Sequence, residues 1–362
     1  MCYSMVGNKT PRLSPVPPPA TNANEQTAQW KQVLDRCIPA IVTIRMTTTR
    51  AFDTESPGTS QATGFIVDRE RGIILTNRHV VGSGPVVANA ILHNHEEVEL
   101  KAIYRDPVHD FGFFQFDPSQ VRHLKIDAIP LKPENAHIGL DVRVVGNDAG
   151  EKLSILTGTL ARLDRPAPRY GNMSYNDFNT FYYQAASSTS GGSSGSPVLD
   201  RSGAAVALNA AGRRGAASSF YLPLNRVKRA LTLIQKGEEV KRGSLQTTFA
   251  YKPFDELRRL GLTSNLEENL RRTFKKIEGM LVVHSTVRGG PGYQKLKAGD
   301  ILHSIKDEIL TDFVDLEALL DSNVGKPVTA KVIRDQQVVD VLLTVDDLHA
   351  ITPNALLEAG GG

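Results

Sequence analysis

The sequence predicts a mainly β protein in which paired β-barrels are followed by a smaller unit of strands and helices. Short apolar runs rich in β-branched and aromatic residues recur up to about residue 222, with glycines and prolines between them. From about residue 242 onward, strand-like runs flank a helical pattern, which indicates a second unit. A chain of 362 residues is long enough for two or three domains with ample cores.

Individual elements follow from the spacing of apolar residues. In the first unit we expect a helix over 25–37, strands over 65–67, 73–75 and 111–116, and a helix over 224–236. In the second unit we expect a short helix that carries Leu316, Leu319 and Leu320, and a hairpin formed by 328–333 and 338–345.

The ends of the chain and its composition exclude several classes of protein. Residues 1–24 are proline-rich and are expected to be a disordered tail without the apolar core of a secretory signal, and residues 349–362 form a second tail. No apolar run is long enough to span a membrane, and a net charge of +3 does not indicate a nucleic-acid partner. Cys2 and Cys37 do not form a disulfide framework, which favours an intracellular reducing compartment. We expect the nucleus or cytoplasm, with the plastid stroma as the alternative.

The segment 191–200, GGSSGSPVLD, carries the candidate nucleophile Ser194. A serine that attacks a carbonyl needs a tight backbone that aims N–H groups at one point, and Gly192 and Gly195 permit such a backbone. The N–H groups of Gly192 and Ser194 would form the oxyanion hole. The alternative interpretation is a flexible loop rich in serine and glycine.

A candidate base and its partner precede this segment. His79 follows the strand pattern at 73–75 within TNRHVV, where the end of a buried strand would hold it rigidly. Asp110 stands just before the apolar run 111–116 and could accept the Nδ1–H of His79. Asp106 and Asp117 are rivals, but each precedes a proline and therefore indicates a turn.

The candidates occur in the order His79, Asp110, Ser194, which is the order found in chymotrypsin. TNRHVV, the aspartate-led strand and GGSSGSP resemble the HtrA/Deg serine proteases, in particular the plant and fungal branch, over roughly residues 27 to 350. Ser193 and Ser196 stand where that family usually has Asn and Gly. The resemblance implies a chymotrypsin-like double β-barrel protease domain at 25–236 and an α+β PDZ-like domain at 242–348.

The resemblance also implies a function. It points to an ATP-independent serine endopeptidase that acts on misfolded or regulatory proteins, has protein or peptide substrates, and forms a homo-oligomer, commonly a trimer. The alternative is a catalytically silent chaperone or peptide-binding scaffold on the same fold. Trypsin-like enzymes carry an Asp where this chain has Ser188. We therefore expect a pocket of Ser188, Asn209 and Ala210 that accepts small or medium apolar residues.

In the PDZ-like unit, the resemblance places the peptide-binding loop at Ser244, Leu245 and Gln246. Domains of this kind bind C-terminal peptides by strand addition and capture of the carboxylate. Gln246 stands where the family usually has Gly, so a degenerate docking domain is the alternative.

Other histidines are set aside, and no cofactor or metal is expected. His93 and His95 share a strand face, but no cysteine or further histidine completes a set of ligands. His109 lacks the strand context of His79, and we expect it on the surface.

Overall fold

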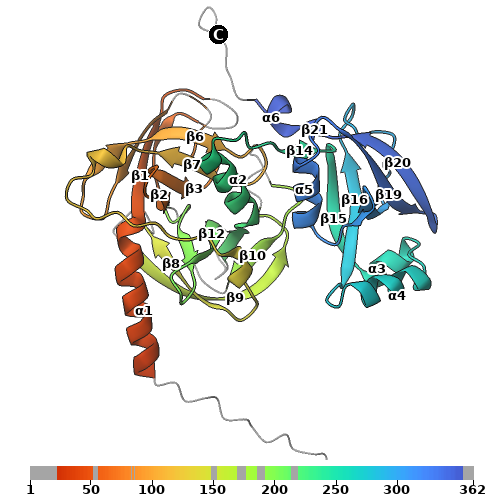
Figure 1. Cartoon of the computed structure of the whole chain (residues 1–362), viewed down its shortest axis with the longest axis horizontal. Coiled ribbons are helices and arrows are strands. Elements are labelled where there is room, and N and C mark those ends of the chain that lie inside the picture. Colours follow the sequence, from red (N-terminus) through yellow and green to blue (C-terminus); the bar gives the residue numbers. More distant parts are fainter. Residues whose placement is uncertain are drawn as a thin grey trace, which may run out of the picture.

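The computed structural model describes residues 23–51, 56–82, 84, 86–147, 153–168, 177–185, 192–212 and 219–353. In these ranges the chain forms two units that lie side by side (Figure 1). The first unit, from α1 to α2, is built mainly from strands, and the second, from β14 to α6, combines a sheet with helices. The mainly β fold and the order of the units are as the sequence predicts. The predicted tails lie largely outside the described residues.

The first sheet has seven strands in the order β5-β4-β1-β2-β3-β7-β6. Its strands are β1 Ile41–Thr48, β2 Gly58–Asp68, β3 Ile73–Thr76, β4 Val86–Ile91, β5 Glu97–Glu99, β6 Lys101–Arg105 and β7 Gly112–Gln115. The end strands β5 and β6 are consecutive in the chain and separated by Leu100 alone, so the sheet must curl until its edges meet. The first barrel is therefore nearly closed, although no ladder joins β5 to β6 among the described residues.

The second sheet closes into a barrel in the order β10-β13-β12-β11-β8-β9. Its strands are β8 Asp141–Gly146, β9 Ser154–Arg165, β10 Tyr182–Ala185, β11 Pro197–Leu199, β12 Ala205–Gly212 and β13 Ser219–Pro223. Val142, Val144, Leu160 and Tyr221 fill its interior and are almost fully buried. The strands that flank the Ser194 segment, β10 and β11, both belong to this barrel.

The first unit begins and ends with a helix in the sequence. Helix α1 (Ala23–Cys37) covers the predicted range 25–37 and buries Trp30, Val33 and Cys37. Helix α2 (Asn225–Lys236) follows the last barrel strand, and its burial of Val227, Ala230 and Leu231 follows from their helical spacing. Short 3₁₀ helices span Ile38–Ala40, Pro118–Gln120 and Pro133–Asn135.

The second unit is a sheet with helices packed on it. Its main strands follow the order β15-β16-β17-β19-β20, with β18 paired to β17, while β14 pairs with β21. The strands are β14 Gly243–Ser244, β15 Thr247–Pro253, β16 Gly279–Thr286, β17 Ile301–Ile305, β18 Glu308–Ile309, β19 Pro327–Arg334, β20 Gln337–Thr344 and β21 Asp346–Asp347. The helices are α3 Phe254–Arg259, α4 Ser264–Thr273, α5 Phe313–Asp321 and α6 Leu348–Ile351. The predicted hairpin is confirmed as β19 and β20, and the predicted short helix as α5.

Two features of the second unit matter for the site. β15 ends the strand order, so one of its edges has no neighbouring strand of the sheet. Helix α5 buries Leu316 and Leu320 in the same core as Phe249 of β15. Phe181 of the first unit packs against this core, so the units share an apolar contact.

No helix in the described part of the chain combines the length and the apolar character needed to cross a membrane.

Candidate active site

His79 and Asp110 form a directly bonded pair. The Nδ1 of His79 lies 2.9 Å from Oδ1 and 3.0 Å from Oδ2 of Asp110. The backbone N–H of His79 also donates to Asp110 Oδ1, at 3.1 Å. The carboxylate is nearly buried, whereas the imidazole is 37% exposed. With Nδ1–H donated to the carboxylate, Nε2 is the ring atom left to act as the base.

The backbone around Asp110 is fixed from both sides. Asn77, two residues before His79, donates its side-chain N–H to the carbonyl of Asp110 at 2.9 Å. The N–H of Asp110 donates to Oδ2 of Asp177 at 3.0 Å. The neighbouring turn is held in the same way, because Arg78 Nε donates to the carbonyl of Asp106 at 2.9 Å. The polar residues of TNRHVV thus hold the loop that carries the aspartate.

Ser194 lies in a tight turn in which glycine is required. Gly192 and Gly195 have φ of +96° and +84°, in the region that favours glycine. A Cβ on Gly195 would collide with the carbonyl oxygen of Thr63 and the hydroxyl of Thr76. This agrees with the prediction that glycine permits an unusual backbone here.

The turn is held between the two barrels. Thr63 of β2 donates its N–H to the carbonyl of Ser194 and its hydroxyl to the carbonyl of Gly192, both at 2.9 Å. On the other side Asn209 of β12 donates to the carbonyl of Ser193 at 2.7 Å and accepts from the N–H of Gly195 at 3.0 Å. Ser194 is therefore at the seam between the barrels, and Thr76 of β3, three residues before His79, lies against Gly195 of the same turn.

The other predicted site residues lie partly beside the Ser194 turn, partly in the second unit and partly outside the described residues. Asn209 and Ala210 are buried next to the Ser194 turn, while Ser188 lies outside the described residues. Ser244 and Leu245 are buried, and Gln246 has a φ of +48° with its N–H bonded to the Ser244 hydroxyl at 2.9 Å. Their role in peptide binding stays a prediction.

The expectation for His109 is wrong. Its side chain is 1% exposed, and Arg242 Nη2 lies 3.1 Å from its Nδ1. Burial and then the charge of Arg242 hold the pKa of His109 well below its usual value, so the ring is neutral. Its partner Arg242 is more than a hundred residues away in sequence, so no local pattern indicates the burial.

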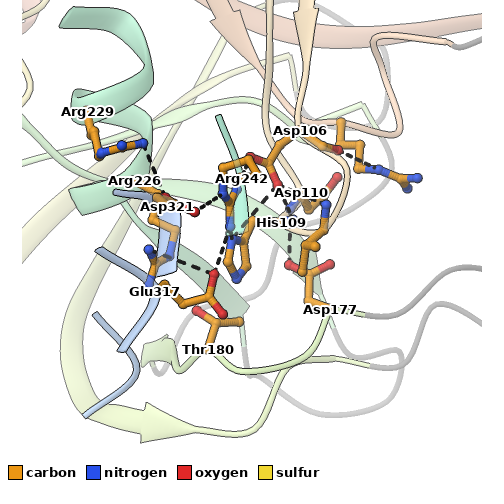
Figure 2. Close-up of polar contacts among 12 residues, drawn as sticks. Asp106, His109, Asp110, Asp177, Thr180, Arg226, Arg229, Arg242, Glu317 and Asp321 are labelled. Carbon is orange, nitrogen blue, oxygen red and sulfur yellow. Dashed lines mark hydrogen bonds and ion pairs between the residues drawn. The ribbon is translucent and has the colours of Figure 1, made fainter. Parts of the chain in front are cut away.

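Around Arg242 the units are joined by a buried cluster of charges, which the sequence reasoning missed (Figure 2). The guanidinium of Arg242 bonds to Asp106 of the first unit. It also bonds to Glu317 at 3.0 Å and Asp321 at 3.2 Å, both on α5. Burial alone would raise the pKa of Asp106, but the charge of Arg242 and backbone N–H donors lower it to about 2.

Asp177 is a further residue that sequence reasoning missed. It is buried, and its Oδ2 accepts the hydroxyl of Tyr182 at 2.6 Å as well as the N–H of Asp110. Burial and the nearby charge of Asp110 raise the pKa of Asp177 to about 8. A neutral carboxyl group thus supports the backbone of the candidate catalytic aspartate (Figure 2).

These features define a class. A nearly closed first barrel that carries a His–Asp pair, a closed second barrel and a glycine-bounded serine turn held between them have the architecture of trypsin-like serine peptidases. Residues 62–208 match the family described as the trypsin-like peptidase domain.

Named relatives narrow the class. The chain is 53% identical over 357 residues to "Protease Do-like 7" of Arabidopsis thaliana, covering 96% of this chain and 32% of that protein. It is 51% identical over 337 residues to "Pro-apoptotic serine protease NMA111" of Chaetomium globosum, covering 93% of this chain and 33% of that protein. The chain thus spans about a third of the length of the curated relatives it matches.

Solved structures agree in fold. "HtrA-type protease AlgW with tripeptide" superposes with a TM-score of 0.62 at 20% identity, covering 88% of this chain and 97% of that chain. The serine endoprotease from Yersinia pestis gives a TM-score of 0.57 at 19% identity, with the same coverage. The chain is thus similar over nearly its whole length to the protease named Do-like and to the serine proteases named NMA111, and it shares its fold with HtrA-type proteases.

Proposed function

We propose that this chain is an ATP-independent serine endopeptidase with Ser194 as nucleophile, His79 as base and Asp110 as its orienting partner. The N–H groups of Gly192 and Ser194 would stabilise the oxyanion of the tetrahedral intermediate. Misfolded or regulatory proteins are the proposed substrates. Two observations carry the proposal: the buried Asp110 is bonded to Nδ1 of His79, and the Ser194 turn is clamped by Thr63 and Asn209.

The geometry supports a specific division of labour. Asp110 would hold the tautomer of His79 and stabilise the imidazolium that forms when Nε2 takes the proton of Ser194. The same proton would then pass from Nε2 to the leaving amine. Hydrolysis of the acyl-enzyme would repeat the sequence with water as nucleophile.

Labelling with a fluorophosphonate probe tests the assignment. The wild-type chain should be labelled and should degrade denatured casein, whereas Ser194→Ala should not be labelled and should lose several orders of magnitude in turnover. Ser202→Ala is the matched control, because Ser202 bonds Asp200 away from this turn. Casein degradation by purified Ser194→Ala at the wild-type rate would refute the assignment.

Specificity forms a second part of the proposal. The pocket of Ser188, Asn209 and Ala210 has no carboxylate among its three residues, so a buried Lys or Arg side chain of the substrate would have no partner there. Cleavage after Val, Ala or Leu is expected. A peptide library whose products end mainly in Lys or Arg would contradict this.

The second candidate function is a catalytically silent chaperone or peptide-binding scaffold. The glycine-bounded Ser194 turn and the His79–Asp110 pair favour the peptidase, because a scaffold needs neither. Absence of probe labelling together with suppression of casein aggregation would favour the scaffold.

We further propose a PDZ-like domain at 242–348, a homotrimer, and an intracellular reducing compartment, the nucleus or cytoplasm with the plastid stroma as alternative. The edge strand β15 beside α5 supports the domain assignment, and the buried free thiol of Cys37 fits a reducing compartment. Solution mass measurement tests the trimer, and imaging of a fluorescent fusion of the full-length protein tests the compartment.

A further inference from the structure

A groove of about 490 Å³ lies on the outer face of the first barrel. Arg45 of β1 and Gln61 of β2 line this groove, and they stand directly opposite each other in the antiparallel ladder. Their neighbours Ile44 and Ala62 belong to the barrel core. Because side chains alternate along a strand, Arg45 and Gln61 point outward, and both are exposed.

Asn147 connects this groove to the Ser194 turn. It lines the groove, and its backbone N–H donates to the hydroxyl of Thr63 at 2.9 Å. That hydroxyl donates in turn to the carbonyl of Gly192 at 2.9 Å. The side chain of Asn147 donates to the hydroxyl of Thr43, on the groove wall, at 2.6 Å. Hydrogen bonds therefore join the groove to the turn that carries the proposed nucleophile.

The position of the groove assigns it to the part of a substrate that follows the cleaved bond. The Ser194 turn lies between Thr63 on one side and Asn209 on the other. Asn209 belongs to the proposed pocket for the residue before the cut. Because an extended chain continues past the nucleophile in one direction, the residues after the cut pass Thr63 and enter the groove.

The register of the strands sets which substrate residue meets Arg45. Gln61 is two residues before Thr63 on β2, which is about 7 Å along a strand. Arg45 is the partner of Gln61 on the neighbouring strand. An extended substrate covers the same distance in two residues, so the second or third residue after the cut lies within reach of the guanidinium.

The charge of Arg45 is available to a ligand. Its side chain has no hydrogen bond or ion pair to any other residue that the structure describes. Glu97 and Glu99 of β5 share its face of the sheet, but β4 lies between them and β1. Asn89 of β4 donates to Glu97 at 2.8 Å. A guanidinium with unused donors binds a carboxylate more strongly than a neutral amide of the same shape.

We propose that Arg45 is a specificity-determining residue that selects an acidic side chain two or three residues after the cleaved bond. The substrates are then polypeptides with a small or medium apolar residue before the cut and Asp or Glu shortly after it. The effect on cleavage rests on the proposed peptidase function, whereas binding of an acidic peptide in the groove does not.

Paired quenched-fluorescence peptides test the selectivity. AAVSDDAA and AAVSNNAA differ only in the charge of the second and third residues after a cut between Val and Ser, which mass spectrometry of the products verifies. At low salt the wild type should cleave the acidic peptide with about three- to fivefold higher kcat/KM, the size expected for an exposed charge pair. The preference should vanish at high salt. Arg45→Gln should cleave both peptides equally, and Arg45→Glu should prefer AAVSKKAA to AAVSDDAA.

Arg69→Gln is the matched control. Arg69 is also exposed, but it follows β2 at the end of the strand away from Gln61, so this variant should keep the wild-type preference. Because Arg45 lies away from the reacting atoms, Arg45→Gln should raise KM for the acidic peptide and leave kcat unchanged. Equal cleavage of the two peptides by the wild type at low salt, or a preference that survives in Arg45→Gln, would overturn the proposal.

A binding measurement separates this proposal from the proposed function. Fluorescent AAVSDDAA and AAVSNNAA are titrated against the Ser194→Ala chain, with fluorescence anisotropy as the readout. The acidic peptide should bind about three- to fivefold more tightly, and adding Arg45→Gln should remove the difference. If neither the wild type nor any variant cleaves a peptide while this difference is found, the peptidase function fails and the acidic groove stands. Equal affinities of the two peptides for Ser194→Ala would overturn the groove.

Discussion

At the residue scale, Asp177 shows how burial changes the chemistry of a carboxyl group. Its Oδ1 has no hydrogen-bond partner among the described residues, while Oδ2 accepts from Asp110 and Tyr182. An ionised group in this position would repel the nearby charge of Asp110. The neutral acid avoids that repulsion and still offers an acceptor to the Asp110 N–H.

The raised pKa of Asp177 predicts a dependence of stability on pH. The folded pKa of about 8 lies above the ordinary Asp value of 3.8, so the folded state keeps a proton that the unfolded state loses. The contribution of Asp177 to stability therefore falls as pH rises from about 4 to about 8. Asp177→Asn imitates the neutral acid but does not titrate. The Tm of the variant minus the Tm of the wild type, measured in thermal unfolding scans, should therefore increase across this pH range.

Asp200→Asn is the control for this experiment. The pKa of Asp200 is lowered: burial opposes ionisation, but bonds from Ser202, Asn135 and backbone N–H groups outweigh it. Its stabilising effect is complete above the unfolded pKa, so Asp200→Asn should lower Tm by an amount that is constant between pH 5 and 8. A flat difference for Asp177→Asn as well would show that Asp177 is ionised in the folded chain.

At the element scale, the Ser194 turn was predictable and its surroundings were not. Glycine spacing around Ser194 and the strand before His79 are local signals, and both elements are found in the predicted places. The buried cluster joins Asp106, Arg242 and Glu317, which are distant in sequence and indistinguishable there from solvated charges. Burial of His109 follows from that long-range contact, which is why its predicted surface position was wrong.

The geometry of the Ser194 turn predicts that two glycine substitutions with similar backbone strain differ in their effect on activity. Gly195→Ala introduces strain at φ +84° and a collision with Thr63, whereas Gly139→Ala introduces strain at φ +88° with no atom within 4 Å. Both should lose roughly 1–2 kcal/mol of stability from the positive φ. Only Gly195→Ala should also lose about 100-fold or more in kcat/KM for a peptide substrate, because it displaces Ser194, the proposed nucleophile. Equal activity in the two variants would contradict this description of the turn.

At the scale of the whole molecule, the buried charges make the two units one body. Arg226 and Arg229 of α2 reach α5 as well: Arg226 donates to the carbonyl of Phe313 at 2.6 Å, and Arg229 lies 3.2 Å from Asp321. Arg242, at the entry to the second unit, connects α5 to the turn that precedes Asp110 (Figure 2). Loss of the Arg242 charge would therefore leave buried carboxylates in both units without their partner.

Arg242→Met should uncouple the units. Removing one partner of a buried ion cluster leaves the carboxylates without compensation and costs about 3–5 kcal/mol. The surface pair of Arg201 with Asp141 provides the control, since Arg201→Met should cost less than about 1 kcal/mol. In calorimetry the wild type and Arg201→Met should unfold in one transition, whereas Arg242→Met should show an earlier, separate transition for the second unit. Because the cluster is buried, this difference should persist at high salt, where surface pairs are screened. A single transition for Arg242→Met at the wild-type Tm would show that the apolar contact of Phe181, rather than the charges, holds the two units together.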